Sequence, residues 1–161
     1  MQEPLNTRPH LTSLRVQSFH GDNLAEADGA LWKLELQQDI QMALAVPKVS
    51  GAGLQAVVKI ELTAQAKSEQ GHAQPASFKG LYEAKFNYVL EVTEVSVAQL
   101  MEQEPYQYML VAQAYPLAMT HFRRELQAMG FDARNLPLGL TTQGEIDNAP
   151  QKSLNLTSSP P

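Results

Sequence analysis

The chain has 161 residues, a formal net charge of −5 at pH 7 and no cysteine. Its length suits one domain with a sizeable core, and its acidic balance argues against nucleic acid as a partner, because binding phosphate needs Lys and Arg in excess. The lack of cysteine excludes disulfides, thiolate metal sites and cysteine nucleophiles together. We expect a flexible N-terminus at residues 1–10, one domain at 11–140 and a disordered tail at 141–161.

We expect neither a secretory signal peptide nor a membrane-spanning segment in this sequence. The first ten residues, MQEPLNTRPH, have no basic start followed by an apolar run, which a secretory signal peptide needs. The most apolar later stretch, Tyr106 to Met119, is interrupted by polar residues and by Pro116, and it is shorter than the ~20 apolar residues of a membrane-spanning helix. We therefore predict a cytoplasmic protein without membrane insertion.

The first predicted strand covers about residues 11–20 and carries Leu14, Val16 and Phe19. The following segment, Asn23 to Gly29, is polar, small and acidic, which is typical of a loop. We interpret this segment as a crossover that leads to the strand beginning at Trp32.

Three further runs alternate between apolar and polar residues, as a strand with one buried face does. They cover Trp32 to Val46, Leu54 to Lys67 and Phe78 to Val92. Turn residues around Gly51 separate the first two runs, and a polar loop separates the last two, so we expect two hairpins. The pattern predicts a four-stranded antiparallel sheet with one wet face.

After Thr93 the period changes to that of helices. Ser96 followed by Gln99 has the spacing of a capping box, which predicts a short helix at about 97–103. Pro116 is placed as the first residue of a second helix that ends at Gly130. An apolar stripe follows this helix at spacings of four, three, four and three, and it either seals the monomer core or joins two subunits: Tyr115, Met119, Phe122, Leu126 and Met129.

The sequence offers little catalytic chemistry. The four histidines lie far apart without a second ligand at metal spacing, and no phosphate-binding glycine loop, nucleophile elbow or triad is present. We predict that the protein is not an enzyme and has no cofactor, metal ion or catalytic residue.

Two groups of side chains give stronger indications of function. Asp22, Glu26 and Glu83 place carboxylates at the edge and on the wet face of the predicted sheet, where a solvated sheet face is the simplest explanation. Aromatic and thioether side chains gather around the crossover and the helix starts. Such residues usually belong to a core, but they also form adaptable surfaces for varied apolar ligands.

The order of these elements and several local motifs resemble SecB, the bacterial export chaperone. The resemblance covers about residues 12–140. It is carried by the following segments: Asp22-Asn23-Leu24-Ala25-Glu26, Leu81-Tyr82-Glu83, Tyr115-Pro116, Met129-Gly130-Phe131 and Arg134-Asn135-Leu136-Pro137-Leu138. SecB continues into a second long helix after the Pro segment, whereas residues 141–161 have no helical period.

The resemblance implies an α+β fold, with a four-stranded antiparallel sheet and helices packed on one face, assembled as a homo-oligomeric dimer of dimers. It implies a holdase that binds unfolded preproteins without ATP and delivers them to the translocase motor SecA. The residues that would dock SecA are Asp22, Glu26, Leu81 and Glu83. We expect a client groove lined by Trp32, Leu34, Leu36, Tyr108 and Met109.

Two alternatives stay open. SecB-like chaperones also serve toxin–antitoxin systems, in which they protect an aggregation-prone antitoxin. A hot-dog thioesterase is an alternative of another class, and it needs a carboxylate or histidine directed into a pocket at the helix. The candidates for that group are Glu102, Glu104, His121 and Glu125.

Overall fold

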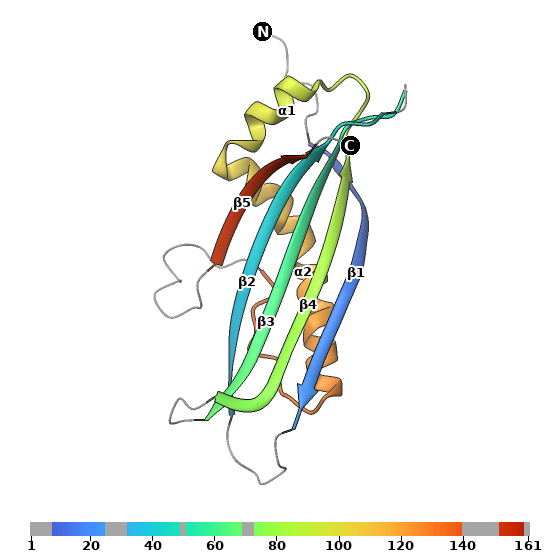
Figure 1. Ribbon diagram of the computed structural model, residues 1–161. Coiled ribbons are helices and arrows are strands. Elements are labelled where there is room, and N and C mark those ends of the chain that lie inside the picture. Colours follow the sequence, from blue (N-terminus) through green and yellow to red (C-terminus); the bar gives the residue numbers. More distant parts are fainter. Residues whose placement is uncertain (1–7, 25–31, 49–50, 69–72, 140–151, 160–161) are drawn as a thin grey trace.

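A twisted sheet forms one layer of the fold and two helices form the other (Figure 1). The computed structural model describes residues 8–24, 32–48, 51–68, 73–139 and 152–159. The strand order in the sheet is β1-β4-β3-β2-β5. The strands are β1 (His10–Asn23), β2 (Trp32–Ala45), β3 (Gln55–Ser68), β4 (Ala73–Asn87) and β5 (Lys152–Ser159).

The predicted antiparallel sheet is confirmed. β2 pairs with β3 and β3 pairs with β4, both antiparallel, as the two predicted hairpins require. β1 pairs with β4 and not with β2, so the chain crosses over between its first two strands, as predicted. The fourth strand begins and ends five residues earlier than the alternating run suggested, at Ala73 and Asn87.

The helices differ from the prediction at their boundaries. α1 (Glu94–Met101) begins three residues earlier than expected, because Thr93 is its N-cap and accepts a hydrogen bond from the Ser96 amide at 3.3 Å. α2 (Glu104–Ala128) begins with Pro105 in its first turn, where a proline costs no hydrogen bond. Pro116 therefore lies inside α2 and not at its start. One side-chain bond near it, from the Thr120 hydroxyl to the Pro116 carbonyl, measures 2.6 Å.

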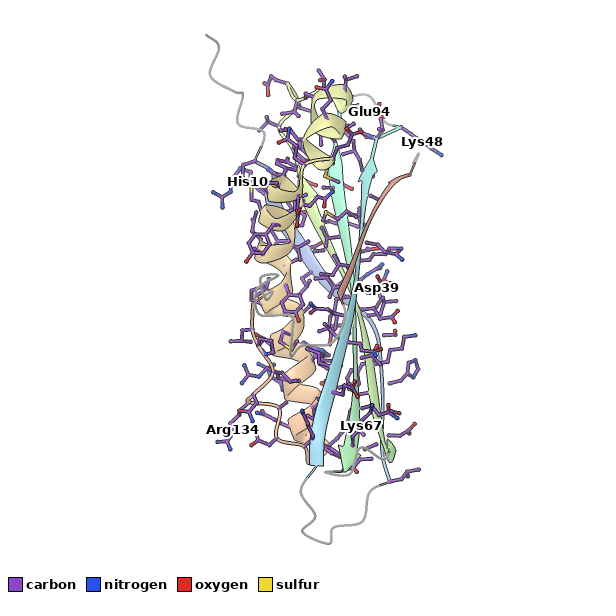
Figure 2. The ribbon with its side chains drawn as sticks, turned by 90° about the vertical axis from the view of Figure 1, so that its left-hand side faces the viewer. His10, Asp39, Lys48, Lys67, Glu94 and Arg134 are labelled. Carbon is purple, nitrogen blue, oxygen red and sulfur yellow. The ribbon has the colours of Figure 1, made fainter. Side chains whose placement is uncertain are left out.

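The core lies between α2 and one face of the sheet (Figure 2). The even-numbered residues of β3 from Ala56 to Ala66 are all fully buried, which confirms the alternation seen in the sequence. Four members of the predicted stripe are buried against this face, namely Tyr115, Met119, Phe122 and Leu126, and Met129 packs at its margin. The stripe therefore seals the core of the monomer, which decides between its two interpretations.

The predicted tail contains a strand. Residues 152–159, expected to be disordered, form β5, which adds to β2 in parallel. Main-chain hydrogen bonding can order such a segment at a sheet edge without a large apolar surface, which is why its polar composition was misleading. The remaining tail residues, 141–151 and 160–161, lie outside the described residues, as do residues 1–7 of the predicted flexible N-terminus.

Candidate functional site

Three of the four predicted SecA-docking residues lie on the face of the sheet that the helices leave open. Cross-strand neighbours share a face, and the register pairs Asp22 with Ser77, Ser18 with Leu81 and Arg15 with Glu83. Asp22 is exposed and Leu81 is half-buried. Leu81 lies four residues along β4 from Ser77, the register partner of Asp22. Leu81 and Asp22 are therefore separated by roughly 13 Å along the sheet. Glu26 lies outside the described residues.

Glu83 differs from the exposed carboxylate that we expected. Only 9% of the Glu83 surface is exposed to solvent, although Glu83 lies on the open face of the sheet. The Arg15 guanidinium donates to one carboxylate oxygen, Oε1, at 3.1 Å, and the Gln17 amide donates to the other, Oε2, at 3.1 Å. This carboxylate is therefore already paired within the subunit, and little of it is available to a basic partner.

A β-bulge helps to build this contact. The register of β1 against β4 shifts between Val16 and Ser18, which leaves Gln17 as the additional residue. A second shift, between Leu11 and Ser13, accompanies a hydrogen bond of 3.1 Å from the Thr12 hydroxyl to the Lys85 carbonyl. The bulge thus brings the Gln17 amide to the carboxylate that Arg15 also binds.

Other carboxylates of the open face also have basic partners. Lys79 lies 3.6 Å from Glu61, and Lys67 forms an ion pair with Glu35. Together with the Arg15–Glu83 pair, these contacts distribute both signs of charge over β1, β2, β3 and β4. Of the carboxylates that the sequence analysis grouped here, namely Asp22, Glu26 and Glu83, the structure places a cation beside Glu83.

Within the subunit, the structure separates four of the predicted client-groove residues, Leu34, Leu36, Tyr108 and Met109, into two groups. The Tyr115 hydroxyl on α2 donates to the Gln38 side chain on β2, which fixes where the helix crosses that strand. α2 begins beside the end of β4 and ends beside the end of β1, so it runs opposite to β2. Tyr108 lies seven residues before Tyr115, or about 10 Å along the helix. Leu36 lies about 7 Å from Gln38 in the opposite direction.

The burial of these residues also differs. Leu36 is buried at 7% exposure and pairs with Ala64 in the register, and Leu34 is partly buried and pairs with Ala66. Tyr108 is 43% exposed on the outside of α2, and Met109 packs partly against the core. Trp32 begins β2, and its side chain lies outside the described residues. The predicted groove is therefore two separate groups, of which the Leu34–Leu36 group belongs largely to the core.

The candidate residues of the enzyme alternative occupy two different environments. Glu102 and Glu104 are exposed at the junction of α1 and α2. His121 lies between sheet and helix, with Nδ1 at 2.9 Å from the Tyr82 hydroxyl and Nε2 at 3.5 Å from Glu125 Oε1. Burial, assisted by the Glu125 charge, raises the pKa of the Tyr82 hydroxyl well above its ordinary range. This group connects two layers of the fold, which sequence spacing alone did not indicate.

No three or more His, Asp or Glu side chains in the described ranges gather in a way that could hold a metal ion. No helix in that part of the chain combines the length and the apolar character needed to cross a membrane.

Comparison with known proteins identifies the fold. No family model matches the chain, and no curated protein matches it significantly. Among solved structures, it is similar to the Mycobacterium tuberculosis Rv1957 SecB-like chaperone, solved in complex with a ChAD peptide from the Rv1956 HigA1 antitoxin. The similarity has a TM-score of 0.56 at 14% sequence identity and covers 84% of this chain and 90% of the other. The chain therefore has a SecB-like fold.

Proposed function

We propose that this protein is a chaperone that binds unfolded polypeptides without ATP and has no catalytic activity. The observation that carries the proposal is the SecB-like fold, shared with a chaperone that was solved with a peptide bound. An unfolded client exposes apolar side chains and unpaired backbone, and a chaperone can cover both without reading a sequence. Burying apolar surface at ~25 cal/mol per Å2 gives useful affinity over a long segment even where each contact is weak.

The first test is a titration of the full chain with a freshly diluted, urea-unfolded secretory precursor. Light scattering reports aggregation of the precursor, and fluorescence reports the single tryptophan, Trp32. Suppressed aggregation with a saturable fluorescence change is the expected result. A protein that fails to suppress aggregation of several unrelated unfolded precursors is not a general holdase.

Delivery of clients to SecA is the more specific part of the proposal. It rests on the resemblance of the Asp22–Glu26 and Leu81–Glu83 segments to SecB and on the shared open face of Asp22, Leu81 and Glu83. Glu83→Arg should abolish SecA binding, but it also places a second cation beside Arg15 and removes a paired carboxylate. Asp22→Arg is the cleaner variant because Asp22 is exposed. Unchanged SecA affinity of Asp22→Arg in low salt would contradict this docking surface.

Protection of an antitoxin is the second candidate function. It is favoured by one observation, namely that the similar M. tuberculosis chaperone was solved with an antitoxin peptide. The paired state of Glu83 is consistent with this candidate, since binding an antitoxin requires no carboxylate surface for a motor. A toxin and antitoxin pair encoded beside this protein, with client binding restricted to that antitoxin, would favour this role over export.

Assembly into a dimer of dimers is also part of the proposal. β1 forms one edge of the described sheet, and an edge strand offers unpaired main-chain groups to another chain. Light scattering coupled to size-exclusion chromatography would give the mass of the assembly. A mass of one subunit at micromolar concentration would contradict assembly.

A further inference from the structure

The other edge of the sheet is occupied by the chain itself. β5 pairs with β2 from Gln38 opposite Lys152 to Ala45 opposite Ser159 (Figure 1). The remaining strand pairs described for the sheet are antiparallel. Without β5, the outer main-chain groups of β2 over this range would be available to another strand.

β5 has the properties of a segment that can dissociate from β2. Parallel pairing is slightly less stable per residue than antiparallel pairing, and pairing with β2 is the one substantial contact that β5 makes among the described elements. Its sequence, KSLNLTSS, contains only two large apolar residues, Leu154 and Leu156. In the sequence, residues 140–151 separate β5 from the preceding described segment.

The β2 edge has the properties of a site for an extended polypeptide. Leu154 and Leu156 stand in register with Ile40 and Met42, which are each 1% exposed on the core face. Leu44, two residues further along β2, is also buried. A strand that adds to this edge therefore forms main-chain hydrogen bonds with β2 whatever its own sequence is. Every second residue of that strand lies beside the buried apolar row.

We propose that the β2 edge from Gln38 to Ala45 receives an extended stretch of an unfolded polypeptide as an added strand, and that Lys152–Ser159 is a displaceable occupant of that edge. This inference rests on the proposed chaperone function and names where its client binds. An occupant belonging to the same chain competes with every client. The apparent association constant of a client is its intrinsic association constant multiplied by the fraction of time that the edge is free. The buried apolar row of Ile40, Met42 and Leu44 beside the edge favours clients with alternating apolar residues over polar ones.

A reversible cross-link between the two strands tests the proposal in the full chain. The natural sequence has no cysteine, so a single introduced pair is unambiguous. Gln41 and Asn155 are register partners, and neighbouring strands lie about 4.8 Å apart, within the range that a disulfide spans. The test variant is Q41C/N155C. Its matched control is Q41C/K59C, which cross-links β2 to its partner on the other side, β3.

The probe is reduced, carboxymethylated α-lactalbumin, a permanently unfolded polypeptide whose thiols are blocked, with binding followed by fluorescence anisotropy. We expect oxidised Q41C/N155C to bind at least tenfold more weakly than the same protein after reduction, while Q41C/K59C binds equally in both states. Equal binding by oxidised and reduced Q41C/N155C overturns the inference and leaves the chaperone function standing. Absence of binding by every form, wild type included, overturns both.

A second variant loosens β5 without a cross-link. Leu154→Pro with Asn155→Pro removes the amide donors of two adjacent residues, so whichever of them faces β2 loses its hydrogen bond. Leu154→Ala with Asn155→Ala is the control that keeps both donors. We expect the proline variant to bind the probe several-fold more tightly than the alanine control. A proline variant that binds no better than that control, or a Q41C/N155C pair that does not oxidise, contradicts the proposal.

Discussion

Tyr82 on β4 and His121 on α2 are joined by a hydrogen bond between the tyrosine hydroxyl and Nδ1, at 2.9 Å. Nε2 of the same ring faces Glu125, which favours a proton on Nε2. Nδ1 is then the acceptor, and the Tyr82 hydroxyl donates to it. The two rings also meet edge to face with their centroids 5.5 Å apart. A polar contact thus fixes the rotation of α2 over the sheet.

Tyr82→Phe should lower the free energy of unfolding by about 1 kcal/mol, the usual net contribution of one hydrogen bond. The ring and its apolar contacts are kept, so no cavity is formed. Urea unfolding followed by far-UV circular dichroism measures the change. Tyr108→Phe is the control, because Tyr108 is 43% exposed and its variant should stay within about 0.5 kcal/mol of wild type. Equal effects of the two variants would contradict the role of this contact.

Gly80 is required by the position of the Tyr82 ring. A Cβ atom built on Gly80 would lie 2.7 Å from Tyr82 Cε2, which is too close for two carbon atoms. Gly80→Ala should therefore displace the ring from His121 and cost about 1–3 kcal/mol in urea unfolding, as overpacking does. Gly139→Ala is the control, since a Cβ there meets nothing within 4 Å. A Gly80→Ala variant as stable as Gly139→Ala would show that the ring can move freely.

Stability should fall at alkaline pH. Burial raises the pKa values of Tyr82, Tyr88 and Tyr115 well above the ordinary tyrosine value of 10.0. The unfolded chain therefore loses these protons first as the pH rises, so the stability they contribute is complete below pH 10 and declines above it. Each such tyrosine contributes a slope of up to about 1.4 kcal/mol per pH unit. Urea unfolding between pH 8 and 11 should give a smaller slope for Tyr115→Phe than for wild type.

The sequence predicted the parts of the fold that depend on a regular side-chain period. The alternation of β3 and the stripe of α2 both mark buried faces. The sequence also contains an indication of the two bulges of β1. The apolar residues Leu11 and Leu14, and likewise Val16 and Phe19, are three residues apart and not two. The sequence pattern predicts a helix start at Pro116, because an interior proline costs a hydrogen bond. Packing of α2 on the sheet overrides this local penalty.

Features set by tertiary position could not be predicted in this way. Leu154 and Leu156 alternate like a strand, but no local pattern indicates that their segment pairs with β2. Likewise, the sequence does not show which residue of a strand a helix residue contacts. Leu36 and Tyr108 are therefore predicted to line one groove, although the Tyr115–Gln38 contact lies between them in the structure. The pairing of Glu83 with Arg15 joins residues 68 positions apart in the chain.

The Arg15–Glu83 pair should be measurable by a double-mutant cycle of Arg15→Ala and Glu83→Ala. The Glu83 side chain is 11% exposed but that of Arg15 is 65% exposed, so solvent screens the pair and we expect a coupling energy of about 0.5–1 kcal/mol. The Lys79–Glu61 pair, at 3.6 Å with side chains 56% and 36% exposed, is the control and should couple by less than about 0.3 kcal/mol. Similar couplings for both pairs would mean that the shielding of Glu83 adds nothing. A larger coupling for Arg15–Glu83, reduced in 1 M salt, would show that Glu83 has a structural role, which any docking experiment with Glu83→Arg must separate from partner binding.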